Sequence, residues 1–309
     1  MSCYNPASVL FNTSGSEVGT IIYPNGTVRL QVDAAFGRTA STDAFGMLRV
    51  SNPLTLFDSK QIYSNQSQYW NTSTTNASIT WTQAKSMSQL SASLTQNAEA
   101  VRQTKRYFNY QPGKSLEIIS TFNLNNSGSG MQKRIGYFDA NDGIFLELSG
   151  TAVSLVRRTS TSGTPVDNKV AQASWNTDPM DGTSASGIDL DWSKVQIMMI
   201  DIEWLGVGAV RVGFVINGLL NYAHEFRHTN VLDLVYMQTP NLPVRYEVKN
   251  LVGAGATNRT LDSICCTVVS EGGAENIGYT RVADRGNTQF SLSPGTPRPL
   301  VGIRLQSDH

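Results

Sequence analysis

Short runs of β-branched and aromatic residues, interrupted by Gly, Asn and Asp, recur along most of the chain. Helical periodicity is nearly absent: in the best helix candidate, residues 84–101, Ser and Thr crowd the sequence and the apolar residues do not follow i, i+3, i+4 spacing. From about residue 99 to residue 271 the strand signals become regular, with turn residues at short and fairly even intervals. The predicted strands are residues 100–110, 116–124, 131–138, 144–148, 151–157, 195–204, 210–216, 244–248 and 264–270. This pattern predicts a mostly β protein, an antiparallel two-sheet jelly-roll (concanavalin-like) sandwich over residues 61–271.

The first 60 residues differ from the rest. Two short extended runs, 19–23 and 27–32, flank the turn signal Pro-Asn-Gly at 24–26, and the string DAAFGR at 33–38 is echoed by DAFGMLR at 43–49. Each unit has too few apolar residues to close a core of its own. We therefore predict that residues 1–60 form an extended N-terminal arm that orders itself on a neighbouring molecule; an irregular segment of the main domain is the alternative interpretation. The assembly residues of this predicted arm are Phe36, Phe45, Leu48, Leu54, Leu56 and Phe57.

Two further segments lie outside the regular strand pattern. Residues 64–98 are polar apart from Trp70 and Trp81, and are expected to form loops or outer strands. Residues 272–309 read as a Gly/Pro-containing tail with a strand-like piece at 299–304, which we expect to pack on the sandwich or on a partner.

Composition narrows the classes of partner. The chain of 309 residues carries 24 Lys and Arg against 24 Asp and Glu, so its net charge is zero, and only 16% of its residues are charged. A neutral chain lacks the basic field that draws a protein to nucleic acid, so no nucleic-acid partner is expected. No apolar run reaches the 18 or more residues of a membrane span, so no membrane partner is expected either. Low charge weakens repulsion between copies, which favours a homo-oligomer or a larger assembly.

One run of alternating residues suggests glycosidase chemistry. In Met199-Ile-Asp201-Ile-Glu203 the odd-numbered positions share one face of a strand. Laminarinase-like retaining glycosidases carry three carboxylates in such an alternation, with the first as nucleophile, but here the first position is a methionine, which cannot form the glycosyl-enzyme ester. We expect a structural role instead. A hairpin turn near Val207 would place Glu203 opposite Arg211 as a cross-strand ion pair.

A second motif has the form of a zinc site. The string His224-Glu-Phe-Arg-His228 matches H-E-x-x-H, which needs a helix to bring both imidazoles to one face. Here the string follows a predicted strand after only Asn217-Gly218, so ordinary strand or loop histidines are expected. The glycan or metal candidates are thus Asp201, Glu203, His224 and His228, and we expect no catalytic set, no cofactor and no resident metal.

Several long strings resemble a group of virion structural proteins, mostly uncharacterised, of tailed bacteriophages and other large DNA viruses. The resemblance covers about residues 43–273 and again 299–305, and it implies a place in a virus particle rather than a reaction. The strings are DAFGMLRVSNPLTLFDSK at 43–60, YQPGKS at 110–115, RIGYFDANDGIF at 134–145, WN at 175–176, DGTSASGIDLD at 181–191, EWLGVGAVRVGF at 203–214, YMQTPNLPVRYE at 236–247 and SEGG at 270–273.

Pattern and resemblance together predict a non-enzymatic structural component of a virion: a capsid decoration, collar, tail or fibre-associated protein that contacts other virion proteins and copies of itself. The first alternative is a carbohydrate-binding jelly-roll module that contacts host surface glycans. The second is a zinc-dependent hydrolase that uses His224, Glu225 and His228.

Overall fold

The computed structural model describes residues 20–22, 28–30, 41–273 and 294–295. The chain divides into two compact units, residues 1–274 and 275–309, and all elements named below belong to the first. Near its start, β1 (Thr20–Ile22) pairs antiparallel with β2 (Val28–Leu30). The two extended runs predicted on either side of the Pro-Asn-Gly turn therefore pair as strands.

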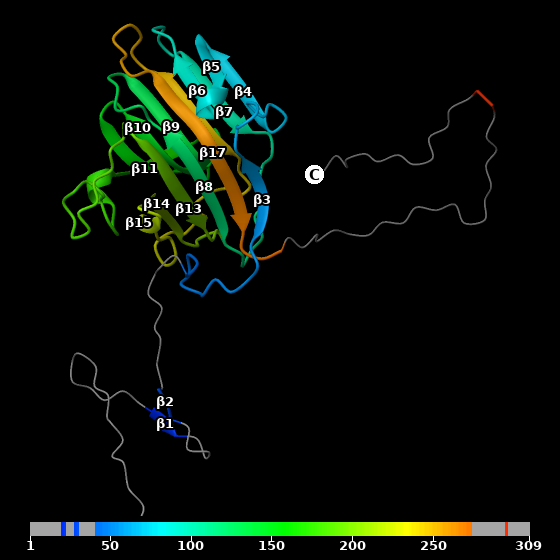
Figure 1. Ribbon diagram of the computed structural model, residues 1–309, viewed down its shortest axis with the longest axis vertical. Helices are drawn as coiled ribbons and strands as arrows, with labels where there is room; N and C mark the ends of the chain where they lie inside the picture. Colours follow the sequence, from blue (N-terminus) through cyan, green and yellow to red (C-terminus); the bar gives the residue numbers. More distant parts are fainter. Residues whose placement is uncertain (1–19, 23–27, 31–40, 274–293, 296–309) are drawn as a thin grey trace, which may run out of the picture. The chain divides into compact units, whose positions relative to one another are not determined.

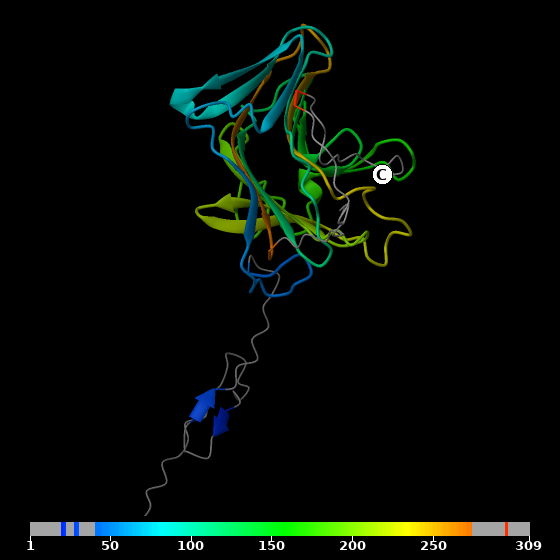
Figure 2. The ribbon, with the colours of Figure 1, turned by 90° about the vertical axis from the view of Figure 1, so that its right-hand side faces the viewer.

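Two antiparallel sheets make up the body and stack face to face (Figures 1 and 2). The predicted two-sheet sandwich is confirmed. The seven-stranded sheet has the order β12 (Val166–Ala171), β11 (Ala152–Thr159), β10 (Gly143–Ser149), β9 (Met131–Phe138), β16 (Val244–Asn250), β7 (Glu99–Thr104) and β4 (Trp70–Thr75). The eight-stranded sheet has the order β15 (Leu219–Phe226), β14 (Val210–Ile216), β13 (Val195–Ile202), β8 (Leu116–Asn123), β17 (Thr260–Ser270), β6 (Met87–Ala92) and β5 (Ala77–Thr82), and β3 (Leu54–Ser59) also pairs with β17.

The core lies between the sheets and follows from the alternation within each strand. In β8, Leu116, Ile118 and Phe122 are buried in the core, while the alternate residues 117, 119 and 121 are half-buried. Because alternate side chains of a strand point to opposite faces, the intervening residues look away from the second sheet. The same rule places Asp201 of β13 and Arg211 of β14 on the outward face of the eight-stranded sheet, and this face carries the site described below.

Several segments differ from the predicted pattern. Residues 84–101, where the sequence showed only a weak helical pattern, hold the end of a short 3-10 turn (Gln83–Lys85), strand β6 and the start of β7. The polar stretch 64–98 contributes β4, β5 and β6, so it includes the outer strands considered above. The sequence pattern predicts no strand between residues 157 and 195, but the edge strand β12 lies there, and its largely exposed residues show little of the alternation on which the strand predictions depend.

Residues 41–60, the last part of the predicted arm, lie on this chain's own sandwich. Residues 54–60 were assigned to the arm, but β3 pairs antiparallel with β17. Leu56 and Phe57 pack against the core, and the Phe57 ring lies 5.6 Å from Phe108. By contrast, Phe45, Leu48 and Leu54 are 44%, 44% and 38% exposed. Phe36 and the strand-like piece at 299–304 lie outside the described residues.

Residues 41–53, here called the leader segment, run along one end of the sandwich (dark blue in Figure 1). A bridge between Thr42 and Leu48 closes a tight turn, and the Asp43 carboxylate accepts hydrogen bonds from the backbone N–H groups of Phe45 and Met47 at 2.9 and 2.8 Å. Gly46 has φ +82°, a left-handed conformation that glycine adopts without strain. The second DAFG string is thus a compact turn. Among the described residues, no helix is long and apolar enough to cross a membrane.

Candidate functional site

A row of charged side chains crosses four neighbouring strands of the eight-stranded sheet. Glu225 of β15 lies opposite Arg211 of β14, Arg211 opposite Asp201 of β13, and Asp201 opposite Glu117 of β8. Their chain neighbours, such as Ile200 and Val212, belong to the core, so these four side chains are on the sheet face that looks away from the second sheet. We call these four residues the charged row.

The leader segment covers this row and supplies a cation to it. The Arg49 guanidinium pairs with Glu117 and, at 2.7 Å, with Asp201, and it lies 3.9 Å from Glu271. The backbone carbonyl of Thr42 accepts hydrogen bonds from both Arg49 and Arg211. Arg49 has only 15% of its side chain exposed, so these contacts are largely shielded from water.

The Asp201 carboxylate is buried and forms ion pairs with two arginines. It is 0% exposed and accepts hydrogen bonds from Ser115 and, at 2.7 Å each, from Arg49 and Arg211. A carboxylate that is paired with two guanidiniums and buried has no open path to a sugar carbon. Its geometry is that of a structural anion.

Glu203 has the opposite environment. Its side chain is 1% exposed, and neither carboxylate oxygen has a hydrogen-bond partner among the described residues. Burial, together with the nearby charges of Asp43, Asp201 and Glu271, raises the pKa of Glu203 to about 7. The carboxyl group is therefore held partly in its neutral form at pH 7, as in a general acid, but it lacks a paired nucleophile because Met199 occupies that position.

The predicted ion pair between Glu203 and Arg211 is wrong. The backbone N–H of Glu203 donates to the carbonyl of Ala209, so Glu203 lies opposite a residue two positions earlier in the chain than the Arg211 that a turn centred on Val207 requires. Asp201 therefore lies opposite Arg211 and pairs with it at 2.7 Å. The predicted common face of Asp201 and Glu203 agrees with the electrostatic contact between them.

The two histidines lie on and just after a strand, not on a helix. His224 is in β15, where its Nδ1 accepts a hydrogen bond from the backbone N–H of Asn176 at 3.2 Å. His228 donates through Nδ1 to the carbonyl of Gly208 and stacks on Tyr236, with ring centroids 4.0 Å apart. Burial lowers the pKa of each histidine to about 4. Among the described residues, no group of three or more His, Cys, Asp or Glu is placed to hold a metal ion.

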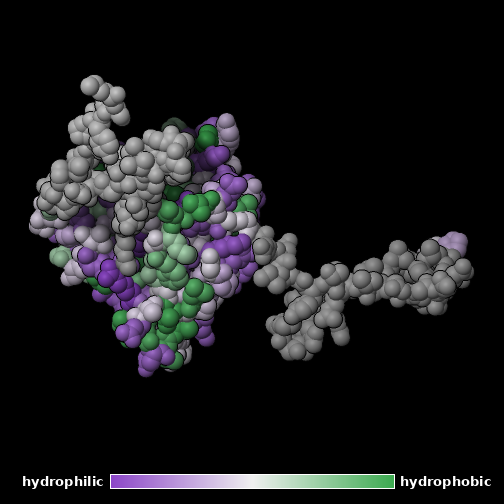
Figure 3. Space-filling view, turned by 90° about the horizontal axis from the view of Figure 1, so that it is seen from below, coloured by the Kyte–Doolittle hydropathy of each residue, from purple (hydrophilic) through white to green (hydrophobic). Residues whose placement is uncertain are grey.

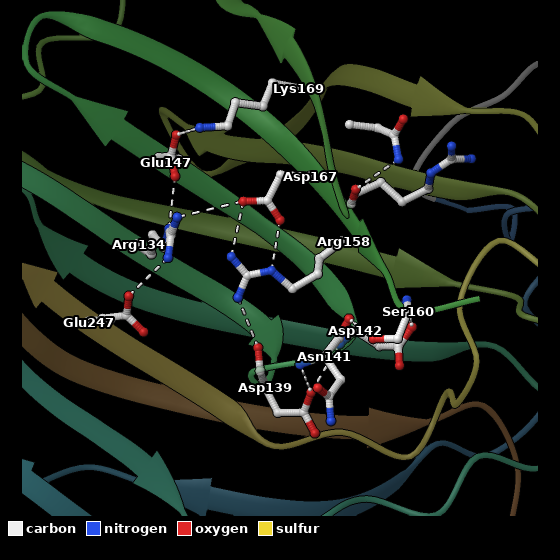
Figure 4. Close-up of polar contacts among 12 residues, drawn as sticks. Arg134, Asp139, Asn141, Asp142, Glu147, Arg158, Ser160, Asp167, Lys169 and Glu247 are labelled. Atoms are coloured by element: carbon white, nitrogen blue, oxygen red, sulfur yellow. Dashed lines mark hydrogen bonds and ion pairs between the residues drawn. The ribbon is translucent and has the colours of Figure 1, made fainter. Parts of the chain in front are cut away.

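The outward face of the seven-stranded sheet carries a second charge network (Figure 4). Arg134 is central to it, within 2.8 Å of Glu147, 3.1 Å of Glu247 and 3.6 Å of Asp167. Each of these carboxylates also contacts a further cation: Lys169 at Glu147, Arg245 at Glu247 and Arg158 at Asp167. This network is complete within its own sheet.

Several open clefts border the sandwich. The first, here called the lateral cleft, has a volume of about 440 Å³ between the edge strands β12 and β15, and its lining includes Arg157, Phe226 and His228. The second has a volume of about 320 Å³ beside β3 and β4, and its lining includes Phe57, Tyr69 and Arg106.

Sequence reasoning found the candidate residues but not the groups that complete their surroundings. Arg49 was visible only as the last residue of the repeated DAFG string, and nothing in that string indicates a partner 152 residues away. Arg157 lay at the end of a predicted strand without any motif. Both became visible only when the strands were placed in their sheets.

No protein-family model matches the chain, and no curated protein matches it in sequence. Among solved structures, a glycosyl hydrolase family protein from Mycobacterium fortuitum is 11% identical, with a TM-score of 0.46 over 70% of this chain and 99% of that chain. A protein of unknown function from Shewanella oneidensis is 9% identical, with a TM-score of 0.46 over 72% and 87% of the two chains. A legume lectin-like domain from Entamoeba histolytica is 8% identical, with a TM-score of 0.39 over 70% and 97%. These similarities assign no activity to this chain.

Proposed function

We propose that this protein is a non-catalytic structural component of a virus particle, and that copies of it associate through an apolar surface on the leader segment. That surface, here called the leader surface, is the observation that carries the proposal. It consists of Phe45, Met47, Leu48 and Val50 of the leader segment together with Leu54 at the start of β3; all five are exposed, with Val50 at 86%. The space-filling view of the end where the leader segment lies shows apolar side chains gathered among polar ones (Figure 3).

The leader surface combines exposure with a fixed backbone. Contacts of Arg49 and Thr42 with the charged row hold the segment on the sandwich, so its apolar side chains are presented by a preformed turn. Contiguous exposed apolar side chains mark interaction surfaces, and a preformed surface loses little entropy on association. A second copy is the expected occupant, because a chain of zero net charge does not repel itself. The assignment to a virus particle rests on the resemblance of the strings between residues 43 and 273.

The charged row supports the non-catalytic part of the proposal. A two-carboxylate glycosidase needs one ionised nucleophile and one proton donor on either side of an open cleft. Here Asp201 is held in ion pairs with Arg49 and Arg211, Met199 stands where the first carboxylate would be, and the leader segment covers the charged row. The same residues therefore act as the anchor of the leader segment.

The test compares two triple variants of the full-length chain. Met47→Ser, Leu48→Ser and Val50→Ser together remove the centre of the leader surface. Val166→Ser, Leu219→Ser and Val231→Ser remove exposed apolar side chains elsewhere (45%, 71% and 71% exposed) and serve as the matched control. We expect wild type and control to sediment as oligomers and to enter particles of the encoding virus, and the leader variant to stay monomeric and outside them. A monomeric wild type, or normal incorporation of the leader variant, would contradict the proposal.

Carbohydrate binding is the second candidate function, and the lateral cleft is the observation that favours it. The cleft combines an apolar wall, formed by Val170 and Phe226, with charged and amide side chains at its rim. Pockets that bind small polar ligands have this combination of apolar lining and a few placed polar groups. A glycan array of neutral and acidic oligosaccharides tests this function, and binding of no glycan above background would dismiss it.

A further inference from the structure

The lateral cleft opens on the side of the sandwich where the two sheets end. On one side it is bordered by β12, the edge of the seven-stranded sheet, and on the other by the end of β15, the edge of the eight-stranded sheet. Its lining residues are Arg157, Asp167, Asn168, Lys169, Val170, Phe226, Arg227 and His228. Ligand-recognition groups from both sheets therefore meet in one cavity of about 440 Å³, which has the size of a small-molecule site.

His228, one of the lining residues, has an unused hydrogen-bond acceptor. Its Nδ1 lies 2.5 Å from the carbonyl oxygen of Gly208, and since a carbonyl only accepts, Nδ1 carries the ring proton. Nε2 is then the acceptor, and it has no partner among the described residues although His228 is only 2% exposed. Stacking on Tyr236 fixes the plane of the ring. A buried acceptor without a donor is costly unless a ligand supplies the missing hydrogen bond.

Arg157 presents an uncompensated positive charge in the same cleft. Its side chain is half-buried, its Nε has no hydrogen-bond partner, and it makes no ion pair with any residue that the structure describes. The charge of Arg157 acts on His228, which places the two groups near each other.

The other charged residues of the cleft are already paired. Asp167 binds Arg158 through both carboxylate oxygens at 2.7 and 3.0 Å, and Lys169 pairs with Glu147 (Figure 4). Arg227 pairs with Glu225 at 3.1 Å. Arg157 is therefore the charged lining residue that is left without a counter-ion among the described residues, and one anion beside it would balance its charge.

We propose that the lateral cleft binds a sugar that carries a carboxylate. The carboxylate pairs with the guanidinium of Arg157, a neighbouring hydroxyl group donates to Nε2 of His228, and an apolar face of the sugar ring packs on Val170 and Phe226. A simple anion satisfies only the first of these contacts and a neutral sugar only the other two. This inference rests on the second candidate function, carbohydrate binding, and names its ligand class.

The experiment measures binding of the full-length chain to glucuronic acid, galacturonic acid and N-acetylneuraminic acid, each compared with its methyl ester, and to acetate. Arg157→Gln removes the charge at similar size. Arg259→Gln is the matched control, since Arg259 is also half-buried and in no ion pair with a described residue, and it lies before β17 outside the cleft. Circular dichroism checks that both variants fold, and the ester comparison needs no variant at all.

We expect at least one free acid to bind at least tenfold more tightly than its ester and than acetate, because charge-assisted hydrogen bonds of this kind are the strong ones. Arg157→Gln should lose that advantage and Arg259→Gln should keep it. Glycan binding with no preference for the acid, or a preference that survives Arg157→Gln, would overturn the inference while leaving carbohydrate binding in place. Binding of no sugar in any form would overturn both, and equal binding of acetate would reduce the cleft to an anion site and overturn the assignment to a sugar.

Discussion

The two outward faces of the sandwich both hold buried charge, but they balance it differently. On the seven-stranded sheet, Arg134 and its three carboxylates form a network in which each carboxylate also contacts a second cation from the same sheet. On the eight-stranded sheet, Glu117 and Glu271 make ion pairs with a single described residue, Arg49, which comes from the leader segment. The first face is electrostatically complete by itself. The second needs the leader, so the leader segment is part of the folded body rather than a free arm.

The largest effect is expected from a pair of matched substitutions, Arg49→Gln and Arg134→Gln, which tests whether the two faces balance their buried charge differently. The two arginines have 15% and 13% of their side chains exposed, and each approaches three carboxylates. Arg49→Gln is expected to lower the free energy of unfolding by about 2–4 kcal/mol, because it leaves Glu117 and Glu271 without a cation in a buried setting.

Arg134→Gln is expected to cost less, about 1–2 kcal/mol, because the second cations remain at all three carboxylates. Urea unfolding of both variants at pH 7.5, followed by tryptophan fluorescence, measures the difference. If both variants lose the same free energy of unfolding, the eight-stranded sheet does not depend on Arg49 more than the seven-stranded sheet depends on Arg134, and the proposed difference between the two faces is contradicted.

The next largest effect concerns Glu203, a buried carboxyl group with no ion pair or side-chain hydrogen bond among the described residues. Its pKa in the folded protein is about 7, against a usual value of 4.5, so the folded state retains this proton to a higher pH than the unfolded chain does. The free energy of unfolding contributed by this group therefore falls as pH rises from about 4.5 to 7, and remains reduced above that.

Glu203→Gln, which cannot ionise, is expected to stabilise the protein by about 1–3 kcal/mol at pH 8 and by much less at pH 4.5. Thermal unfolding of wild type and variant across this pH range tests it. Taking the difference between the two proteins cancels the contributions of His224 and His228, which titrate in both. A difference that does not change with pH would mean that Glu203 is ionised normally in the folded state.

The smallest effect is expected at the rim of the complete network. Lys169 pairs with Glu147 but has 43% of its side chain exposed, so water and salt screen the pair. Lys169→Gln should change the free energy of unfolding by less than about 1 kcal/mol. A loss as large as that of Arg49→Gln, measured in the same urea titration, would show that the network depends on its exposed edge.

Much of the strand pattern could be predicted from the order of residues. The runs 131–138 and 210–216 match the bounds of β9 and β14, because in both a Gly- or Asn-containing turn ends a clear run of strand-forming residues. The edge strand β12 was missed since its exposed residues carry little alternation. The sequence identified the candidate residues but not their partners. Asp201 and Glu203 were placed on one face, but the hairpin pairs Glu203 with Ala209, so Arg211 lies opposite Asp201.

The alternation of apolar and polar residues is a local property, and it was enough to establish a two-sheet β-sandwich and the faces of its strands. Charge pairing across the sheets is not local, because it depends on which strands become neighbours and in which register. Arg49 contacts Asp201, which lies 152 positions later in the chain, and β3 pairs with β17, which lies about 200 residues later in the chain. Packing of the two sheets decided those contacts, because only there do the buried carboxylates require the cation that the leader segment carries.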